Sequence, residues 1–105
     1  MQVVKHITDL QTILNIKKKE GLKIGFVPTM GALHEGHLSL VKKAGQETDL
    51  VVVSIFVNPT QFNDKADLER YPRDLAKDAA LLTSTPCQIS FIKKLSGIYK
   101  NTDNN

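Results

Sequence analysis

Two histidines, His34 and His37, lie three residues apart in a segment that joins a predicted strand to a predicted helix. If the helix begins near them, this spacing puts both imidazoles on one helix face and directs them at the same volume. As imidazolium ions or as neutral N–H donors, they would stabilise the negative charge that builds on a triphosphate when its α-phosphorus is attacked. If the pair is catalytic, its role is therefore electrostatic rather than nucleophilic.

The residues around the two histidines favour an anion as the ligand. Backbone N–H groups at a helix N-terminus point outward, and the helix dipole attracts negative charge there. Gly31 and Gly36 carry no side chain that would block the close approach of a ligand. Residues 28–37 are therefore predicted to form a phosphate-binding turn.

Two other interpretations of the histidines start from the same spacing. The letters HEGH resemble the zinc-binding helix HExxH, but the second histidine comes one residue early and a third ligand is not evident, so we predict no metal site. The two histidines could also be exposed or capping residues at the start of a helix. Spacing alone leaves the choice between capping and catalysis open.

The elements that would position this turn follow from the periodicity of the apolar residues. Helical spacing is found over residues 8–19, 35–46 and 72–83. Strand composition is found over residues 22–27, 50–57 and 88–92. Thr8 and Gln11 form a predicted capping box at the start of the first helix. Pro28 is expected to end the first strand, and Pro72 suits the first turn of the third helix.

The alternation of these elements predicts an α/β fold. The order helix, strand, helix, strand, helix, strand makes two successive βαβ units, with parallel strands and right-handed crossovers. Three strands and three helices amount to about half of a Rossmann-like, doubly wound parallel sheet. Ligands of such sheets bind beyond the carboxyl ends of the strands, which here means residues 28–37 and 58–71.

Composition limits the chain to one domain or part of one. Its 105 residues are 41% hydrophobic and 24% charged, as in ordinary soluble globular chains. The net charge of +3 owes much to the lysine run 17–19, and without interleaved aromatic residues it does not indicate nucleic-acid binding. The single cysteine, Cys87, allows no internal disulfide and is expected to be a small buried residue. No apolar run is long enough for a signal peptide or a membrane span, so a cytoplasmic location is the default.

Three segments of the chain resemble one enzyme family. Residues 26–37, FVPTMGALHEGH, resemble a signature of the pantothenate synthetase (pantoate–β-alanine ligase) family and contain the HxGH motif of a wider nucleotidyltransferase superfamily. Residues 53–62, VSIFVNPTQF, resemble a second signature, and residues 67–73, DLERYPR, resemble the segment that follows it. The resemblance extends over about residues 1–92, whereas HxGH alone would identify only the superfamily.

The resemblance implies roles for individual residues. It implies an ATP site lined by Met30, Gly31, Ala32, Leu33, His34, Glu35, Gly36 and His37. His34 and His37 are implied to be catalytic residues near the phosphates, and Gln61 is implied to bind pantoate and β-alanine. Asn58 and Tyr71 are weaker candidates, since they could serve a turn and helix packing. Asp78 matches a family position near magnesium, and a solvated charge is an equal interpretation.

The same resemblance implies a reaction and its partners. The reaction is the ATP-dependent condensation of pantoate with β-alanine through a pantoyl-adenylate, with Mg²⁺ for the triphosphate charge and release of AMP and pyrophosphate. A homodimer is implied, and residues 1–105 would be the N-terminal part of a Rossmann-like ATP- and pantoate-binding domain, without the family's C-terminal lid domain. The isolated chain is then expected to be weakly active or inactive. The alternatives are a non-catalytic nucleotide- or pantoate-binding module and another HxGH nucleotidyltransferase, and the NPTQF segment argues against the second.

Overall fold

The computed structural model describes the backbone of residues 1–57 and 65–94 and the side chains of residues 1–56 and 74–93. The strands are β1 (Gln2–Val4), β2 (Ile24–Thr29), β3 (Leu50–Val57) and β4 (Cys87–Lys94). The helices are α1 (Ile7–Lys19), α2 (Glu35–Glu47) and α3 (Lys65–Thr83).

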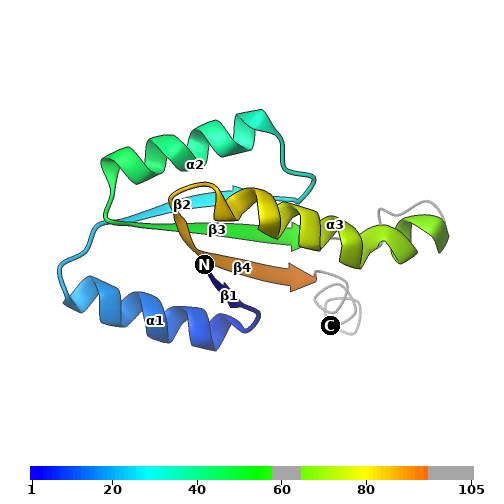
Figure 1. Cartoon of the computed structure of the whole chain (residues 1–105). Coiled ribbons are helices and arrows are strands. Elements are labelled where there is room, and N and C mark those ends of the chain that lie inside the picture. The colour runs from blue at the N-terminus through cyan, green and yellow to red at the C-terminus, as the bar shows by residue number, and fades with distance from the viewer. Residues whose placement is uncertain (58–64, 95–105) are drawn as a thin grey trace.

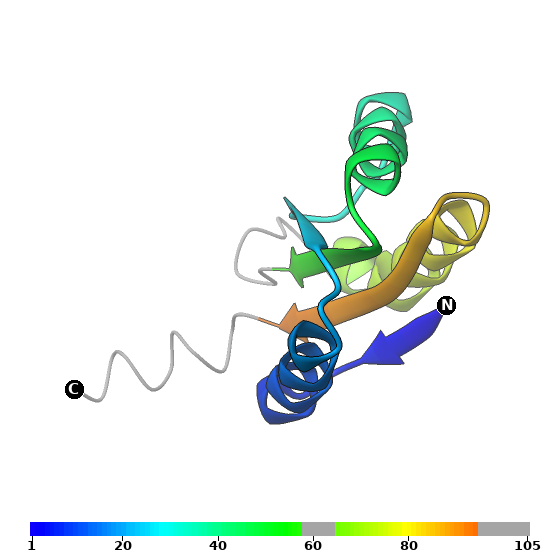
Figure 2. The ribbon, with the colours of Figure 1, turned by 90° about the vertical axis from the view of Figure 1, so that its left-hand side faces the viewer.

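The strands form one parallel sheet in the order β1-β4-β3-β2. Helices α2 and α3 lie on one face of this sheet, and α1 lies on the other (Figures 1 and 2). This arrangement confirms the predicted α/β, Rossmann-like class. Within the part of the chain that the structure describes, none of the helices has the length and apolarity that a membrane crossing requires.

Strand β3 is the most deeply buried element of the sheet. Val51, Val53 and Ile55 pack against α2 and α3, whereas Leu50 and Val52 pack on the side of α1. Because helices cover both faces, successive side chains are all buried and the sequence of this strand does not alternate between apolar and polar residues. The predicted strand over residues 50–57 is therefore confirmed.

The expectation of three strands is wrong by one. Strand β1 pairs in parallel with β4 at one edge of the sheet, where Val4 lies opposite Phe91. It contains three residues, and Val4 is the only one of them that is buried. A segment this short has no measurable periodicity, which is why the sequence did not reveal it.

Two prolines lie inside elements that they were expected to limit. Strand β2 continues through Pro28 to Thr29, and among the described strands it pairs on one side only, with β3. Helix α3 begins at Lys65, so Pro72 lies in its interior rather than in its first turn. A proline there removes one helical hydrogen bond without ending the helix.

The predicted Thr8–Gln11 capping box is also wrong. Helix α1 begins at Ile7, and His6 is its N-cap without a side-chain hydrogen bond. Thr8 instead lies inside the first turn, where its carbonyl accepts a hydrogen bond of 2.9 Å from Thr12 Oγ1. Helix α2 starts at Glu35 as predicted, and it ends at Glu47, one residue later than expected.

Helix α2 approaches the loop before β4 closely at Gly45, where a Cβ atom would lie 2.6 Å from Pro86 Cβ. We expect Gly45→Ala to destabilise the fold by about 1–3 kcal/mol, because the rigid proline ring cannot move aside. Alanine ordinarily stabilises a helix by roughly 0.5–1 kcal/mol relative to glycine, so the expected sign is reversed here. Urea denaturation measures the change, with Gln46→Ala on the exposed face of the same helix as the control. A gain in stability for Gly45→Ala would contradict this contact.

Candidate functional site

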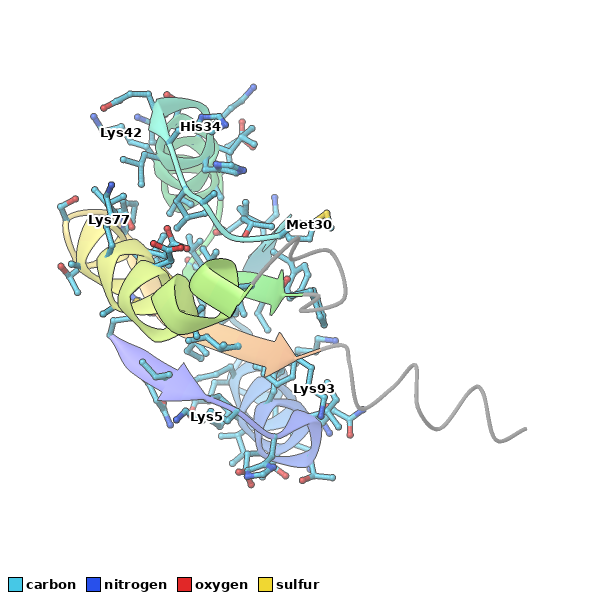
Figure 3. The ribbon with its side chains drawn as sticks, turned by 90° about the vertical axis from the view of Figure 1, so that its right-hand side faces the viewer. Lys5, Met30, His34, Lys42, Lys77 and Lys93 are labelled. Carbon is cyan, nitrogen blue, oxygen red and sulfur yellow. The ribbon has the colours of Figure 1, made fainter. Side chains whose placement is uncertain are left out.

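The connection between β2 and α2, residues 30–34, lies at the carboxyl end of the sheet. Figure 3 looks onto this end and labels Met30 and His34, the first and last residues of the connection. Its first half is tied to β3 by Thr29, whose Oγ1 donates to the carbonyl of Ser54 at 2.9 Å and accepts from the N–H of Gly31 at 3.4 Å. The turn therefore starts from a fixed point on the buried strand.

The middle of the connection has a left-handed backbone. Gly31 has a φ of 89° and Ala32 has a φ of 52°. Glycine adopts such angles freely, but they cost a residue with a Cβ about 1–2 kcal/mol. Ala32 therefore has to be held in place by contacts elsewhere in the structure.

Asp78 of α3 supplies those contacts. Its side chain is 4% exposed, and its two carboxylate oxygens accept from the N–H of Ala32 at 3.1 Å and from that of Leu33 at 3.0 Å. The interpretation of Asp78 as a solvated charge is therefore wrong. Sequence reasoning had no local signal for this role, because Asp78 lies 45 residues or more from the two amides.

The two histidines form a reciprocal capping box at the start of α2. His34 is the N-cap residue, and its Nδ1 accepts from the N–H of Gly36 at 3.0 Å. His37 Nδ1 accepts in return from the N–H of His34 at 3.2 Å. The ring centroids are 4.2 Å apart at an angle of 48°. The structure thus brings the pair together as predicted, and the capping interpretation that spacing left open describes its geometry.

These bonds determine what the imidazoles offer to a ligand. A backbone N–H can donate only to an unprotonated nitrogen, so each Nδ1 is unprotonated and the proton of the neutral ring is on Nε2. His34 is exposed and His37 is half-buried. The capped arrangement therefore corresponds to neutral Nε2–H donors, one of the two forms considered from the sequence.

The same bonds alter the predicted role of the backbone. The N–H groups of residues 31–34 and of Gly36 all have side-chain acceptors within the protein. These N–H groups are therefore not vacant positions for a phosphate. The side-chain donors that the capped arrangement leaves at this turn are the two imidazole Nε2–H groups.

The remaining predicted site residues occupy different environments. Met30 is 63% exposed, and Ala32 and Glu35 are also exposed. Leu33 packs into the core beneath α2 and α3, so its side chain is buried within the protein. Tyr71 belongs to α3, but its side chain lies outside the described residues, as do Asn58 and Gln61 altogether.

Two further groups bear on the chemistry of the chain. Cys87 is buried, its Sγ donates to the carbonyl of Ile89 at 3.3 Å, and burial raises the pKa of its thiol. It is therefore a small buried residue, as predicted, and burial of this kind disfavours the reactive thiolate. Among the side chains that the structure describes, those of residues 1–56 and 74–93, no group of three His, Cys, Asp or Glu is arranged to hold a metal ion.

Comparison with known proteins decides the family. A family model described as pantoate-beta-alanine ligase matches residues 2–104. The chain belongs to this family. The resemblance seen in the three sequence segments is thereby confirmed.

Individual relatives agree with this assignment. The pantothenate synthetase of Bacteroides fragilis is 50% identical over 103 residues, which are 98% of this chain and 36% of that protein. The pantothenate synthetase of Thermosipho melanesiensis is 52% identical over 101 residues, which are 96% and 36% of the two chains. The chain thus spans a little over a third of the length of the relatives that it matches.

Solved structures of the family have the same fold. One match is a pantoate-β-alanine ligase from Francisella tularensis, whose structure was solved in complex with β-γ ATP and β-alanine. It matches with a TM-score of 0.73 and 48% identity, and the match covers 95% of this chain and 38% of the Francisella chain. The pantothenate synthetase of Thermus thermophilus matches with a TM-score of 0.62 and 43% identity over 89% of this chain and 32% of its own.

The capping bonds can be tested through the tautomers of the histidines. We expect ¹⁵N–¹H NMR of the imidazoles to show protonated Nε2 and unprotonated Nδ1 at both His34 and His37. His6, an N-cap without a side-chain hydrogen bond, is the internal control and should show a mixture of tautomers.

The variant Gly36→Ala sharpens this test. A Cβ at residue 36 would lie 2.8 Å from His34 Cε1 and 3.1 Å from its Nδ1. The His34 ring should turn away, lose its single tautomer and destabilise the helix start by about 0.5–2 kcal/mol. A protonated Nδ1 on either histidine of the unmodified protein would contradict the capping geometry.

Proposed function

We propose that this chain supplies part of the active site of an ATP-dependent, AMP-forming pantoate–β-alanine ligase. The observation that carries the proposal is the His34–His37 pair, whose Nδ1 atoms are engaged by the backbone so that both Nε2–H groups are donors at the carboxyl end of the sheet. Membership of the ligase family supports it. So does the Francisella tularensis ligase, whose structure was solved in complex with β-γ ATP and β-alanine.

The proposed reaction has two steps. A pantoate carboxylate oxygen attacks the α-phosphorus of ATP, the bond from that phosphorus to the bridging oxygen breaks, and pyrophosphate leaves. The amine of β-alanine then attacks the acyl carbon of the pantoyl-adenylate, loses a proton, and AMP leaves. His34 and His37 donate to phosphate oxygens whose negative charge increases in the first step.

The other substrate contacts of this proposal come from the second segment. Gln61 is proposed to bind pantoate and β-alanine, because an amide can donate to a carboxylate and accept from a hydroxyl or an amine. Asn58 and Tyr71 are proposed to lie near the same substrates. Mg²⁺ is proposed to enter with ATP as part of the substrate, since both oxygens of Asp78 already accept backbone hydrogen bonds.

The domain and its assembly belong to the same proposal. Residues 1–105 form the N-terminal part of a Rossmann-like ATP- and pantoate-binding domain. The outer strands β1 and β2 each have one edge without a partner among the described strands, and such edges favour association. We include a homodimer on this ground, and a cytoplasmic location stays a prediction from the sequence.

The reaction itself is testable with a protein that contains these residues together with the remainder found in the relatives. We expect equal amounts of pantothenate, AMP and pyrophosphate, formed only when ATP, pantoate and β-alanine are all present. Formation of ADP and phosphate would contradict the adenylate route. For residues 1–105 alone, we expect ATP to shift the NMR signals of residues 30–37 with little or no turnover. An absence of turnover in the longer protein as well would favour the non-catalytic binding module.

The role of His37 can be separated from its capping function. We expect His37→Ala and His37→Gln to lower kcat by on the order of 100-fold, with smaller changes in KM for ATP, because both remove an imidazole donor that acts in the transition state. Glutamine is the usual acceptor three residues after an N-cap, so His37→Gln should keep the stability that His37→Ala loses. Steady-state kinetics and thermal unfolding measure the two effects. Near-normal kcat in His37→Gln would reduce His37 to a helix cap.

A further inference from the structure

The turn that carries His34 is fastened to α3 by charge and by packing together. Two consecutive N–H groups, those of Ala32 and Leu33, converge on the Asp78 carboxylate. Consecutive amides in a left-handed turn form a concave site for an anion. Here that concavity is filled from within the protein, by a side chain that is 4% exposed.

The packing around Asp78 reinforces the attachment. Leu75 and Leu82 lie three residues before and four residues after Asp78, so the three side chains share one face of α3. Leu82 belongs to the buried cluster that also contains Leu33, and the partly buried Leu75 packs against that cluster. Leu33 is thus held by its side chain in the core and by its N–H on Asp78, one residue before the N-cap His34.

These contacts limit the conformations available to the histidine pair. Ala32 keeps an unfavourable φ of 52° while its N–H and the next one remain bonded to a charged acceptor. Without that acceptor the turn would relax toward ordinary backbone angles, and His34 would be displaced from the geometry in which its Nδ1 receives the Gly36 N–H. The direction of both Nε2–H groups therefore depends on Asp78.

We propose that Asp78 is a positioning residue for the HxGH turn, acting on the histidines through the backbone of Ala32 and Leu33 without contact with substrate. Its effect on catalysis rests on the ligase activity proposed above, whereas its effect on the turn does not. A displacement of catalytic groups of about 1 Å costs on the order of 100-fold in rate, so an effect of this kind is measurable.

The test compares Asp78→Asn with Asp74→Asn. Asparagine keeps the shape of aspartate but has one acceptor oxygen, and its NH₂ group would face one of the two amides. Asp74 lies one turn earlier on α3, lines the same shallow groove as Asp78 and is exposed, so its substitution changes the charge equally. In the ligase assay we expect kcat to fall by roughly 10–100-fold in Asp78→Asn, with KM for pantoate changed little, and to stay unchanged in Asp74→Asn.

The histidine tautomers supply a readout independent of activity. In Asp78→Asn, the imidazole NMR signals of His34 and His37 should lose their single tautomer and resemble those of His6. Adding Ala32→Gly should restore both the tautomers and much of kcat, because glycine adopts a φ near 52° without strain. A role confined to core stability would not be restored in this way. Unaltered tautomers in a folded Asp78→Asn protein would overturn the proposal, whether or not the protein makes pantothenate.

Hydrogen exchange keeps the proposal testable if Asp78→Asn does not fold. In the unmodified protein, the amides of Ala32 and Leu33 should exchange slowly, as bonded and shielded N–H groups do. Exchange of both at the rate of an unstructured chain would overturn the proposal.

Discussion

The hydrogen bonds from Ala32 and Leu33 to Asp78 join the three parts of the chain on which the candidate site depends. Strand β2 leads into the turn, Asp78 of α3 accepts the two hydrogen bonds of the turn, and α2 begins where the turn ends. A buried carboxylate needs such partners, since an unpaired charge at this depth would be strongly unfavourable. The requirement acts in both directions, because the strained backbone at Ala32 needs a strong acceptor as much as the acceptor needs donors.

The histidine pair changes which donors the start of α2 presents. The N–H groups of His34 and Gly36 donate to imidazole Nδ1 atoms, and the same rings carry N–H donors on Nε2. Each ring thus accepts a hydrogen bond from the helix start on Nδ1 and offers an N–H donor on Nε2, one imidazole width further out. Serial hydrogen bonds of this kind polarise one another. Capping and catalysis are therefore compatible roles for His34 and His37, although spacing alone presents them as alternatives.

The sequence predicts those features that depend on local periodicity or on a long motif. Strand β3 and helix α2 are predictable because their apolar residues repeat over many positions. Strand β1 escapes prediction because it is three residues long, and the predicted start of α3 is misplaced because Pro72 is typical of a first turn. The role of Asp78 has no signal in the sequence, since α3 has to fold over the sheet before this residue meets Ala32. Local signals thus locate the turn, whereas tertiary contacts define its shape.

The position of the turn in the sheet bears on the function proposed above. In the usual Rossmann order, the first strand of the β-α-β-α-β half is central and the ligand lies where the strand order reverses. Strand β2 is the first strand of such a half here, followed by β3 and β4, and it stands at the edge of the described sheet with Phe26 51% exposed. The HxGH turn follows this strand, so it lies at the point where the order would reverse. Under the function proposed above, the exposed His34 and the half-buried His37 would therefore meet their ligand at this end of β2.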